Sequence, residues 1–136
     1  MKHVMVDPLL AAAPWLEGLT RRQLELVSQS TTRLEMPSGH VLAREGRPGY
    51  EFMALLDGTV EVRHDGRVVA TRGRCDYVGE IALLTGKPRT ATVVATSPVI
   101  VDVVGKREFL GLLGEIPQIG ERMFATLPRR VAELVA

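Results

Sequence analysis

The segment that decides the fold is "EFMALLDGTVEVRHDGRVVATR", residues 51–72. Two Asp-Gly pairs, Asp57-Gly58 and Asp65-Gly66, separate apolar stretches within it. Asp-Gly is typical of the tight turns of antiparallel hairpins, because both positions tolerate positive φ. Between the pairs, in "TVEVRH", apolar and charged residues alternate as they do in a half-buried strand. The segment therefore predicts antiparallel strands, with each Asp-Gly pair closing a hairpin.

Short strands continue on both sides of this segment. Upstream, "TTRLEM" (31–36) and "VLA" (41–43) are separated by a turn and followed by a loop rich in Gly and Pro. Downstream, "ATVVAT" (91–96) and "VIVDVV" (99–104) supply two more strands. Many short strands with turn signals between them predict an antiparallel β-roll, of the jelly-roll or double-stranded β-helix kind, over residues 31–104. The fold class is thus mainly β with flanking α-helices.

The N-terminal flank, residues 8–30, is predicted to be helical. Thr20 followed three places later by Gln23 forms a capping-box pattern, which indicates a helix over residues 20–30. The preceding stretch around Trp15 is expected to pack against the core.

The C-terminal flank, residues 105–136, is predicted to contain a short helix and then a longer one. Ile119, Met123 and Leu127 recur at helical spacing, which indicates a core-facing stripe. Pro128 is expected to kink the second helix or to end it at the preceding residue. In total, 1–136 is interpreted as a single domain.

The composition is that of a globular protein without a strong electrostatic field of either sign. Apolar residues make up 46% and charged residues 24% of the 136 residues, and 17 basic against 16 acidic residues leave a net charge of +1. This balance argues against direct nucleic-acid binding or attraction to a membrane surface. The first 18 residues are too short and too interrupted by proline for a signal peptide or a membrane span. The lone Cys75 suits a reducing cytoplasm, so a cytoplasmic location is expected.

The residues that carry chemistry lie in "GEIALLTGKPRTATV", residues 79–93. Helix formers follow Gly79, and a helix start exposes unpaired backbone N–H groups that attract anions. Arg89, placed just after Pro88, presents a planar fork suited to two phosphate oxygens. Glu80 would repel a phosphate, so it is better explained as the acceptor for a sugar hydroxyl. The segment therefore predicts a site for phosphate plus ribose, which is a nucleotide.

Other phosphate-binding motifs do not match the residues of this segment. A P-loop would need a glycine five places before Gly86-Lys87, and Ser or Thr where Pro88 stands. A Rossmann fingerprint would need a βαβ setting. The alternative left open by the residues is a structural crossover in which Arg89 and Glu80 pair with each other.

The longer stretch "YVGEIALLTGKPRTATVVA", residues 77–95, resembles the phosphate-binding cassette of the cyclic nucleotide-binding domain family. That cassette reads aromatic-x-Gly-Glu-x-Ala-Leu and then Pro-Arg-x-Ala-x-Val. The resemblance extends over roughly residues 15 to 125 and implies a β-roll whose helices close over a bound cyclic nucleotide. The matching cassette residues are Gly79, Glu80, Ala82, Leu83, Pro88, Arg89 and Ala91.

The resemblance assigns a role to each part of the cassette. Arg89 would hold the cyclic phosphate, and Glu80 would accept a hydrogen bond from the ribose 2′-hydroxyl. Backbone N–H groups around Ile81, Ala82 and Ala91 would bind the phosphate oxygens.

The remaining contacts concern the sugar and the base. Val62 and Val69, on neighbouring strands, are expected to form apolar walls, and Thr90 is expected to touch the base. A single hydroxyl is worth about 1 kcal/mol, or about fivefold in affinity, so Thr90 alone does not choose between ligands. The resemblance favours cyclic AMP and leaves cyclic GMP as the alternative. The predicted ligand site comprises Gly79, Glu80, Ile81, Ala82, Arg89, Thr90, Ala91, Val62 and Val69.

The expected function is that of a non-catalytic sensor, since no constellation of nucleophile, base and oxyanion donors is visible. Neither a metal nor a resident cofactor is expected. The effector is expected outside this chain, as a partner protein or a further domain, and a homodimer through the C-terminal helix is a further expectation. Two alternatives stay open, a structural or dimerisation roll with an empty pocket and a cupin-like enzyme. The second needs a metal-binding histidine cluster in the barrel.

Several residues are predicted to have no special role. His3, His40 and His64 lack metal-ligand spacing and are interpreted as solvated surface histidines. Arg129 and Arg130 are interpreted as the solvated face of a helix.

Three departures from the family pattern affect turns. Cys75 replaces a glycine that is common just before the cassette strand, and Arg47 replaces an acidic residue. Tyr50 and Glu51 stand where Gly-Asp is more usual. These departures put the geometry of two turns in question.

Overall fold

The structure is a computed structural model that describes residues 6–135. His3 lies outside the described residues. The elements in chain order are α1 (Pro8–Ala11), the 3-10 helix η1 (Pro14–Leu16), α2 (Arg21–Gln29), β1 (Thr32–Met36), β2 (Val41–Ala43), β3 (Glu51–Asp57), β4 (Val60–His64), β5 (Arg67–Arg72), β6 (Tyr77–Val78), α3 (Glu80–Thr85), β7 (Thr92–Ala95), β8 (Val99–Gly105), α4 (Lys106–Glu115) and α5 (Pro117–Val135).

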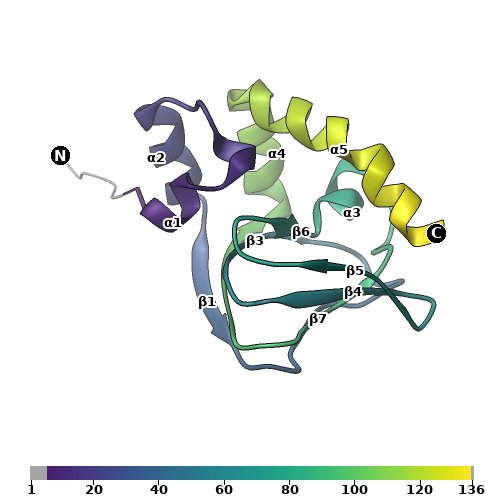
Figure 1. The fold of residues 1–136 in the computed structure, drawn as a ribbon. Coiled ribbons are helices and arrows are strands. Elements are labelled where there is room, and N and C mark those ends of the chain that lie inside the picture. Colours follow the sequence, from purple (N-terminus) through teal and green to yellow (C-terminus); the bar gives the residue numbers. More distant parts are fainter. Residues whose placement is uncertain (1–5, 136) are drawn as a thin grey trace.

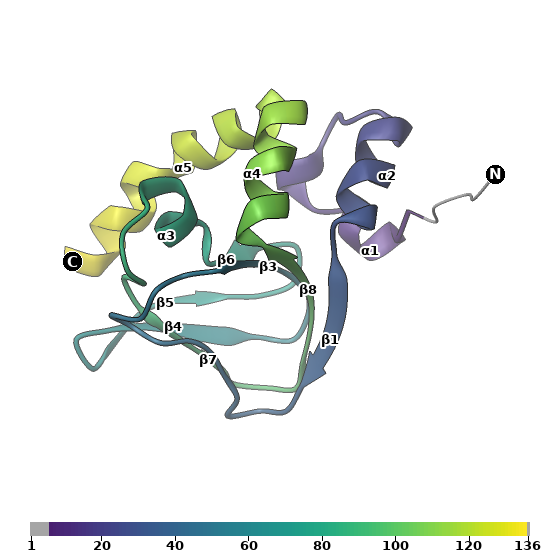
Figure 2. The ribbon, with the colours of Figure 1, turned by 180° about the vertical axis from the view of Figure 1, so that it is seen from behind.

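The strands form two antiparallel four-stranded sheets, which confirms the predicted β-roll with flanking helices. One sheet has the order β1-β8-β3-β6 and the other β2-β7-β4-β5. The helices gather on one side of the roll, with α5 reaching across α3, as both views show (Figures 1 and 2). Among the described helices, none combines the length and the apolar character needed to cross a membrane.

One of the two predicted hairpins is wrong. Asp65-Gly66 does close the β4–β5 hairpin, with φ of 50° and 77°. Asp57-Gly58 instead leads from β3, which pairs with β6 and β8, into β4, which pairs with β5 and β7. An Asp-Gly pair specifies a tight turn with positive φ, but it does not specify which strands pair across that turn.

Strand β3 divides the apolar core into two parts. Its five central residues, 52–56, are all buried, and alternate side chains point to opposite faces. Phe52 and its alternates pack with the helices around Trp15 and Phe109, whereas Met53 and Leu55 pack inside the roll. The ring of Phe52 stacks on Phe109 at 4.8 Å between centroids. One strand thus fixes the helical layer to the roll.

Helix α2 begins as its sequence predicts. The Thr20 hydroxyl accepts a hydrogen bond from the Gln23 backbone N–H, and the Gln23 side chain accepts one from the Thr20 N–H. Two helix-start donors are therefore satisfied by local residues, as in a capping box.

Helix α5 continues through Pro128 and does not end at the preceding residue. Its ribbon curves along its length in both views (Figures 1 and 2). Contacts on both sides of the proline hold the helix to the rest of the protein. The Thr126 hydroxyl lies 3.0 Å from that of Tyr77, and Arg130 pairs with Glu80. These tertiary contacts outweigh the hydrogen bond that a proline removes from a helix interior.

The turn before the cassette strand keeps a glycine-like conformation although it carries Cys75. Its φ is 74°, in the left-handed region that glycine occupies without strain. The Cys75 N–H donates to Leu55 O at 3.0 Å, and the Leu55 N–H donates to Asp76 O at 2.9 Å. Hydrogen bonds to β3 on both sides of this residue thus impose the turn.

We predict that Gly58→Ala will destabilise the protein much more than Gly66→Ala does. Both glycines have positive φ, so each alanine adds about 1 kcal/mol of backbone strain. A Cβ at Gly58 would also lie 2.2 Å from Pro98 O, whereas one at Gly66 meets nothing within 4 Å. Urea unfolding should show a loss of about 3 kcal/mol or more for Gly58→Ala. Equal losses in the two variants would contradict this packing of the inter-sheet turn.

Candidate ligand-binding site

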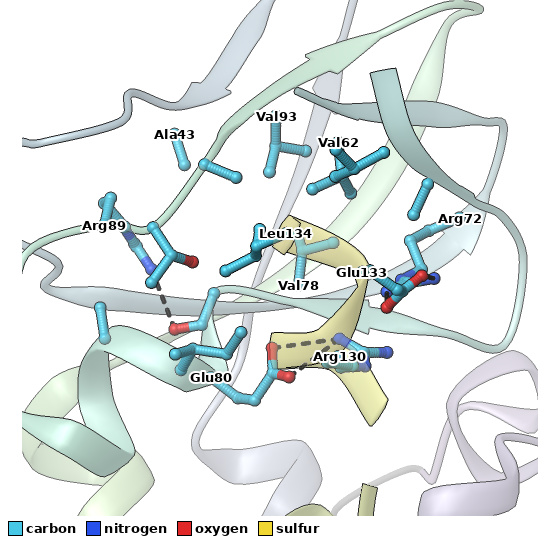
Figure 3. A pocket seen from close by; sticks show the side chains of 17 residues that line it. Ala43, Val62, Arg72, Val78, Glu80, Arg89, Val93, Arg130, Glu133 and Leu134 are labelled. Carbon is cyan, nitrogen blue, oxygen red and sulfur yellow. Dashed lines mark hydrogen bonds and ion pairs between the residues drawn. The ribbon is translucent and has the colours of Figure 1, made fainter. Parts of the chain in front are cut away.

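A cavity lies between the roll, α3 and the end of α5, and all nine residues of the sequence-predicted site line it. Its volume is about 50 Å³ in this structure. Strands β4, β5 and β7 form one wall, and the cassette and α5 form the others (Figure 3). The sequence-predicted residues lining it are Val62, Val69, Gly79, Glu80, Ile81, Ala82, Arg89, Thr90 and Ala91.

The cassette starts at Gly79, the N-cap of α3. Its φ of 92° is left-handed, and no side chain caps the helix start. A Cβ here would lie 2.8 Å from Glu51 O and 2.9 Å from Arg89 Nη1, so only glycine fits. The first N–H groups of a helix have no intrahelical acceptor. In α3 no side chain takes the place of one. The first N–H groups of α3 are therefore available to an acceptor on a ligand.

Arg89 is held at the cavity wall by backbone carbonyls. Its Nη1 donates to Gly79 O at 2.9 Å and its Nη2 to Glu51 O at 2.7 Å. Gly49 makes room for it, since a Cβ there would lie 3.0 Å from Arg89 Nε. Burial lowers the pKa of Arg89, while the charges of Glu51 and Glu80 oppose that shift. A guanidinium has five donors, so these two bonds leave others for an anion.

Glu80 is buried opposite a different arginine. Only 2% of its surface is exposed, and both of its carboxylate oxygens accept from Arg130 Nη1, at 2.9 and 3.1 Å. Burial raises the pKa of Glu80, and the charge of Arg130 opposes this rise. The alternative in which Arg89 and Glu80 pair with each other is therefore wrong. Arg89 and Glu80 have different partners, and both line the same cavity.

Arg130 is one of the site residues that sequence reasoning missed. Its exposure is 8%, so the interpretation as a solvated residue is wrong, although Arg129 is exposed as expected. Besides Glu80, it donates to Tyr77 O at 2.9 Å and lies 4.1 Å from the Tyr77 ring centre. Helical periodicity held a signal, because Arg130 lies seven residues after the buried Met123 and therefore on the same face.

The last turns of α5 cover the cavity. In Figure 3 the yellow ribbon of α5 brings Arg130, Glu133 and Leu134 against the cassette and the roll. Glu133 accepts two hydrogen bonds from Arg72 on β5, at 2.6 and 3.1 Å. Two arginine–carboxylate pairs thus tie the helix down at the mouth of the cavity.

His64 also differs from its predicted solvated role. It is half-buried, and its Nδ1 donates to the carbonyl of Thr90 in the cassette at 2.7 Å. The carboxylates of Glu45 and Asp65 each lie 3.4 Å from one of its ring nitrogens. Within residues 6–135 this is the one cluster placed to share a metal, and it lies at a strand end near the surface. It is not the histidine cluster in the barrel that a cupin-like enzyme requires.

Comparison with known proteins identifies the family. The cyclic nucleotide-binding domain family matches residues 33–115. Over 112 residues the chain is 34% identical to a cAMP-dependent protein kinase regulatory subunit of Hypocrea atroviridis, covering 82% of this chain and 24% of that protein. Over 130 residues it is 35% identical to the acetyltransferase Pat of Mycolicibacterium smegmatis, covering 93% of this chain and 39% of that protein.

A solved structure agrees with this family. The structure of Sp-2Cl-cAMPS bound to PKAR CBD2 superposes with a TM-score of 0.82 at 29% identity, covering 93% of this chain and 87% of that one. The chain spans about a quarter and two fifths of the lengths of the two curated relatives. With the family match, the shared roll and the matching cassette, the chain belongs to the cyclic nucleotide-binding domain family.

Proposed function

We propose that this domain binds a cyclic nucleotide monophosphate, cyclic AMP, and regulates an effector without doing chemistry on the ligand. The observation that carries the proposal is that Arg89 and Glu80 line one cavity, although Glu80 begins α3 and Arg89 lies beyond its end, nine positions later. Cyclic AMP-dependent relatives in the same family support this ligand.

The phosphate end of the ligand would lie against Arg89. Its guanidinium is already fixed by two carbonyls, so little rotamer entropy is lost when it binds an anion. Backbone N–H groups of Ile81, Ala82 and Ala91 would complete the contacts, because these residues line the same cavity. Charge-assisted hydrogen bonds of this kind are about twice as strong as neutral ones.

The ribose end would lie against Glu80. A carboxylate has about four lone-pair positions, and Arg130 occupies two oxygens from one side. A 2′-hydroxyl would therefore donate to Glu80, while the charge of Arg130 opposes the rise in the pKa of Glu80 that burial causes. The base would pack against Val62 and Val69, with the hydroxyl of Thr90 at its edge. Thr90 leaves cyclic GMP as the second candidate ligand.

Binding would be coupled to the position of α5. Pockets for small ligands enclose about 300–1,000 Å³, whereas this cavity measures about 50 Å³ with Leu134 and Glu133 at its wall. The end of α5 therefore has to shift for the nucleotide to enter and can then cover it again. The ligand biases this movement only by its different affinity for the two positions of the helix. We infer that an effector in a partner protein or a further domain senses this movement.

We predict that Arg89→Ala removes cyclic AMP binding and that Arg89→Lys weakens it at least tenfold. The alanine removes the charge, and the lysine loses the planar fork that spans two oxygens. Isothermal titration with cyclic AMP measures both, and Arg107→Ala on the exposed face of α4 is the control with the same charge change. Unaltered binding in Arg89→Ala would refute the phosphate role. An absence of heat in the wild type would instead support a structural roll.

We predict that Glu80 senses the 2′-hydroxyl. Wild-type protein should bind 2′-deoxy-cyclic AMP about 10- to 100-fold more weakly than cyclic AMP, because a hydrogen bond to a charged group is worth about 1.5–3 kcal/mol. Glu80→Gln should bind both ligands with nearly equal, reduced affinity. Competition titrations measure the affinity of each of the two ligands for each of the two proteins. The four affinities form a double-mutant cycle between the 2′-hydroxyl and Glu80. A full 2′-deoxy penalty that persists in Glu80→Gln would place the hydroxyl elsewhere.

A further inference from the structure

A second and larger cavity lies on the other side of Arg130. It is a groove of about 660 Å³ between η1, the segment that follows β5, and one face of α5. Arg72, Arg130 and Glu133 line both this groove and the ligand cavity, so the two share a wall. The proposed cyclic nucleotide site makes no use of the rest of the groove.

The groove concentrates positive charge that the chain as a whole lacks. Five arginines line it against two carboxylates, Asp76 and Glu133, although the net charge of the chain is only +1. Both carboxylates are already paired with Arg72 and Arg130. Within residues 6–135, the other three arginines have no carboxylate within ion-pair distance. These are Arg74, Arg122 and Arg129.

These three arginines still have donors to offer a ligand. Arg122 donates to Trp15 O at 3.0 Å through Nη1, which leaves its other N–H groups. Arg74 and Arg129 are exposed and carry no ion pair within the described part of the chain. The groove is therefore complementary to a ligand that is rich in acceptors.

The spacing of the arginines favours an extended chain. Arg122 and Arg129 lie seven residues apart on α5, which is about 10.5 Å along a helix axis. Three residues of an extended peptide in the polyproline II conformation span about 9 Å, and side chains three residues apart lie on the same side because that helix has three residues per turn. We propose that this groove binds an extended acidic peptide segment of a partner, with carboxylates three residues apart facing Arg122 and Arg129 and with Arg74 on the opposite wall.

The charges of the groove favour an acidic peptide over nucleic acid. Asp76 and Glu133 interrupt the basic surface, and a phosphate backbone would place a charge beside each of them. An acidic peptide can set neutral residues opposite these carboxylates, because its charges are separated by uncharged positions. The planar fork of arginine matches a carboxylate as well as it does a phosphate.

The test is a fluorescence anisotropy titration of a fluorescein-labelled peptide, GESGESG, with the whole chain. The expected result is saturable binding that weakens at least tenfold between 0.05 and 0.3 M NaCl, because the exposed charges are screened. Its glutamine version, GQSGQSG, should bind at least tenfold more weakly. GEESGSG, with equal charge but adjacent glutamates, should bind more weakly than GESGESG.

Charge reversal locates the peptide. The double variant Arg74→Glu with Arg129→Glu should weaken binding at least tenfold, since both side chains are exposed and removing them breaks no ion pair. Reversal of the exposed Arg22 and Arg107, which lie outside the groove, is the matched control, and thermal melting checks that both proteins fold. The proposal is overturned by absent binding, by equal loss in the control, or by displacement of the peptide with equimolar inorganic phosphate. None of these outcomes depends on cyclic nucleotide binding.

Discussion

The structure depends above all on the buried ion pair between Glu80 and Arg130. The pair joins the first residue of the cassette helix to the last helix of the domain, 50 residues later in the sequence. Removing one partner of such a pair costs about 3–5 kcal/mol, because the other charge is left in a poorly solvated place. The position of α5 and the charge state of Glu80 are therefore fixed together. Under the proposed function, a ligand that shares the Glu80 carboxylate would therefore act on the helix.

A second constraint acts on the opposite side of the cavity. Gly49 and Gly79 leave space in which the Arg89 guanidinium packs directly against the backbone, and two carbonyls hold it there. Arg89 is thus placed without any carboxylate partner of its own. Its charge remains available to an anion, whereas the charge of Arg130 is already matched by Glu80 and Asp76. Of the two buried arginines, Arg130 is thus paired with carboxylates and Arg89 is held by carbonyls alone.

Local sequence signals predicted the local structure well. The capping box at Thr20, the hairpin at Asp65-Gly66 and the glycine before the cassette each depend on residues within a few positions of one another. The antiparallel roll followed from the density of short strands and turns. The cassette could be placed on one cavity because its residue pattern is specific.

The features that sequence reasoning missed depend on distant residues. The turn at Asp57-Gly58 joins two sheets, since β3 finds its partners in β6 and β8, and no local pattern records that choice. Arg130 was assigned to solvent because its partners, Glu80 and Asp76, lie 50 and 54 positions earlier in the sequence. The same holds for His64, whose acceptor is the Thr90 carbonyl in the segment between α3 and β7. Non-local pairing becomes visible only when the fold is known.

The most direct test of the account is a crystal structure of the domain grown with cyclic AMP. The account predicts the nucleotide in the cavity beneath α5, with phosphate oxygens about 3 Å from the Arg89 guanidinium and the ribose 2′-hydroxyl at the same distance from Glu80. A nucleotide bound outside this cavity, or one whose phosphate avoids Arg89, would contradict it.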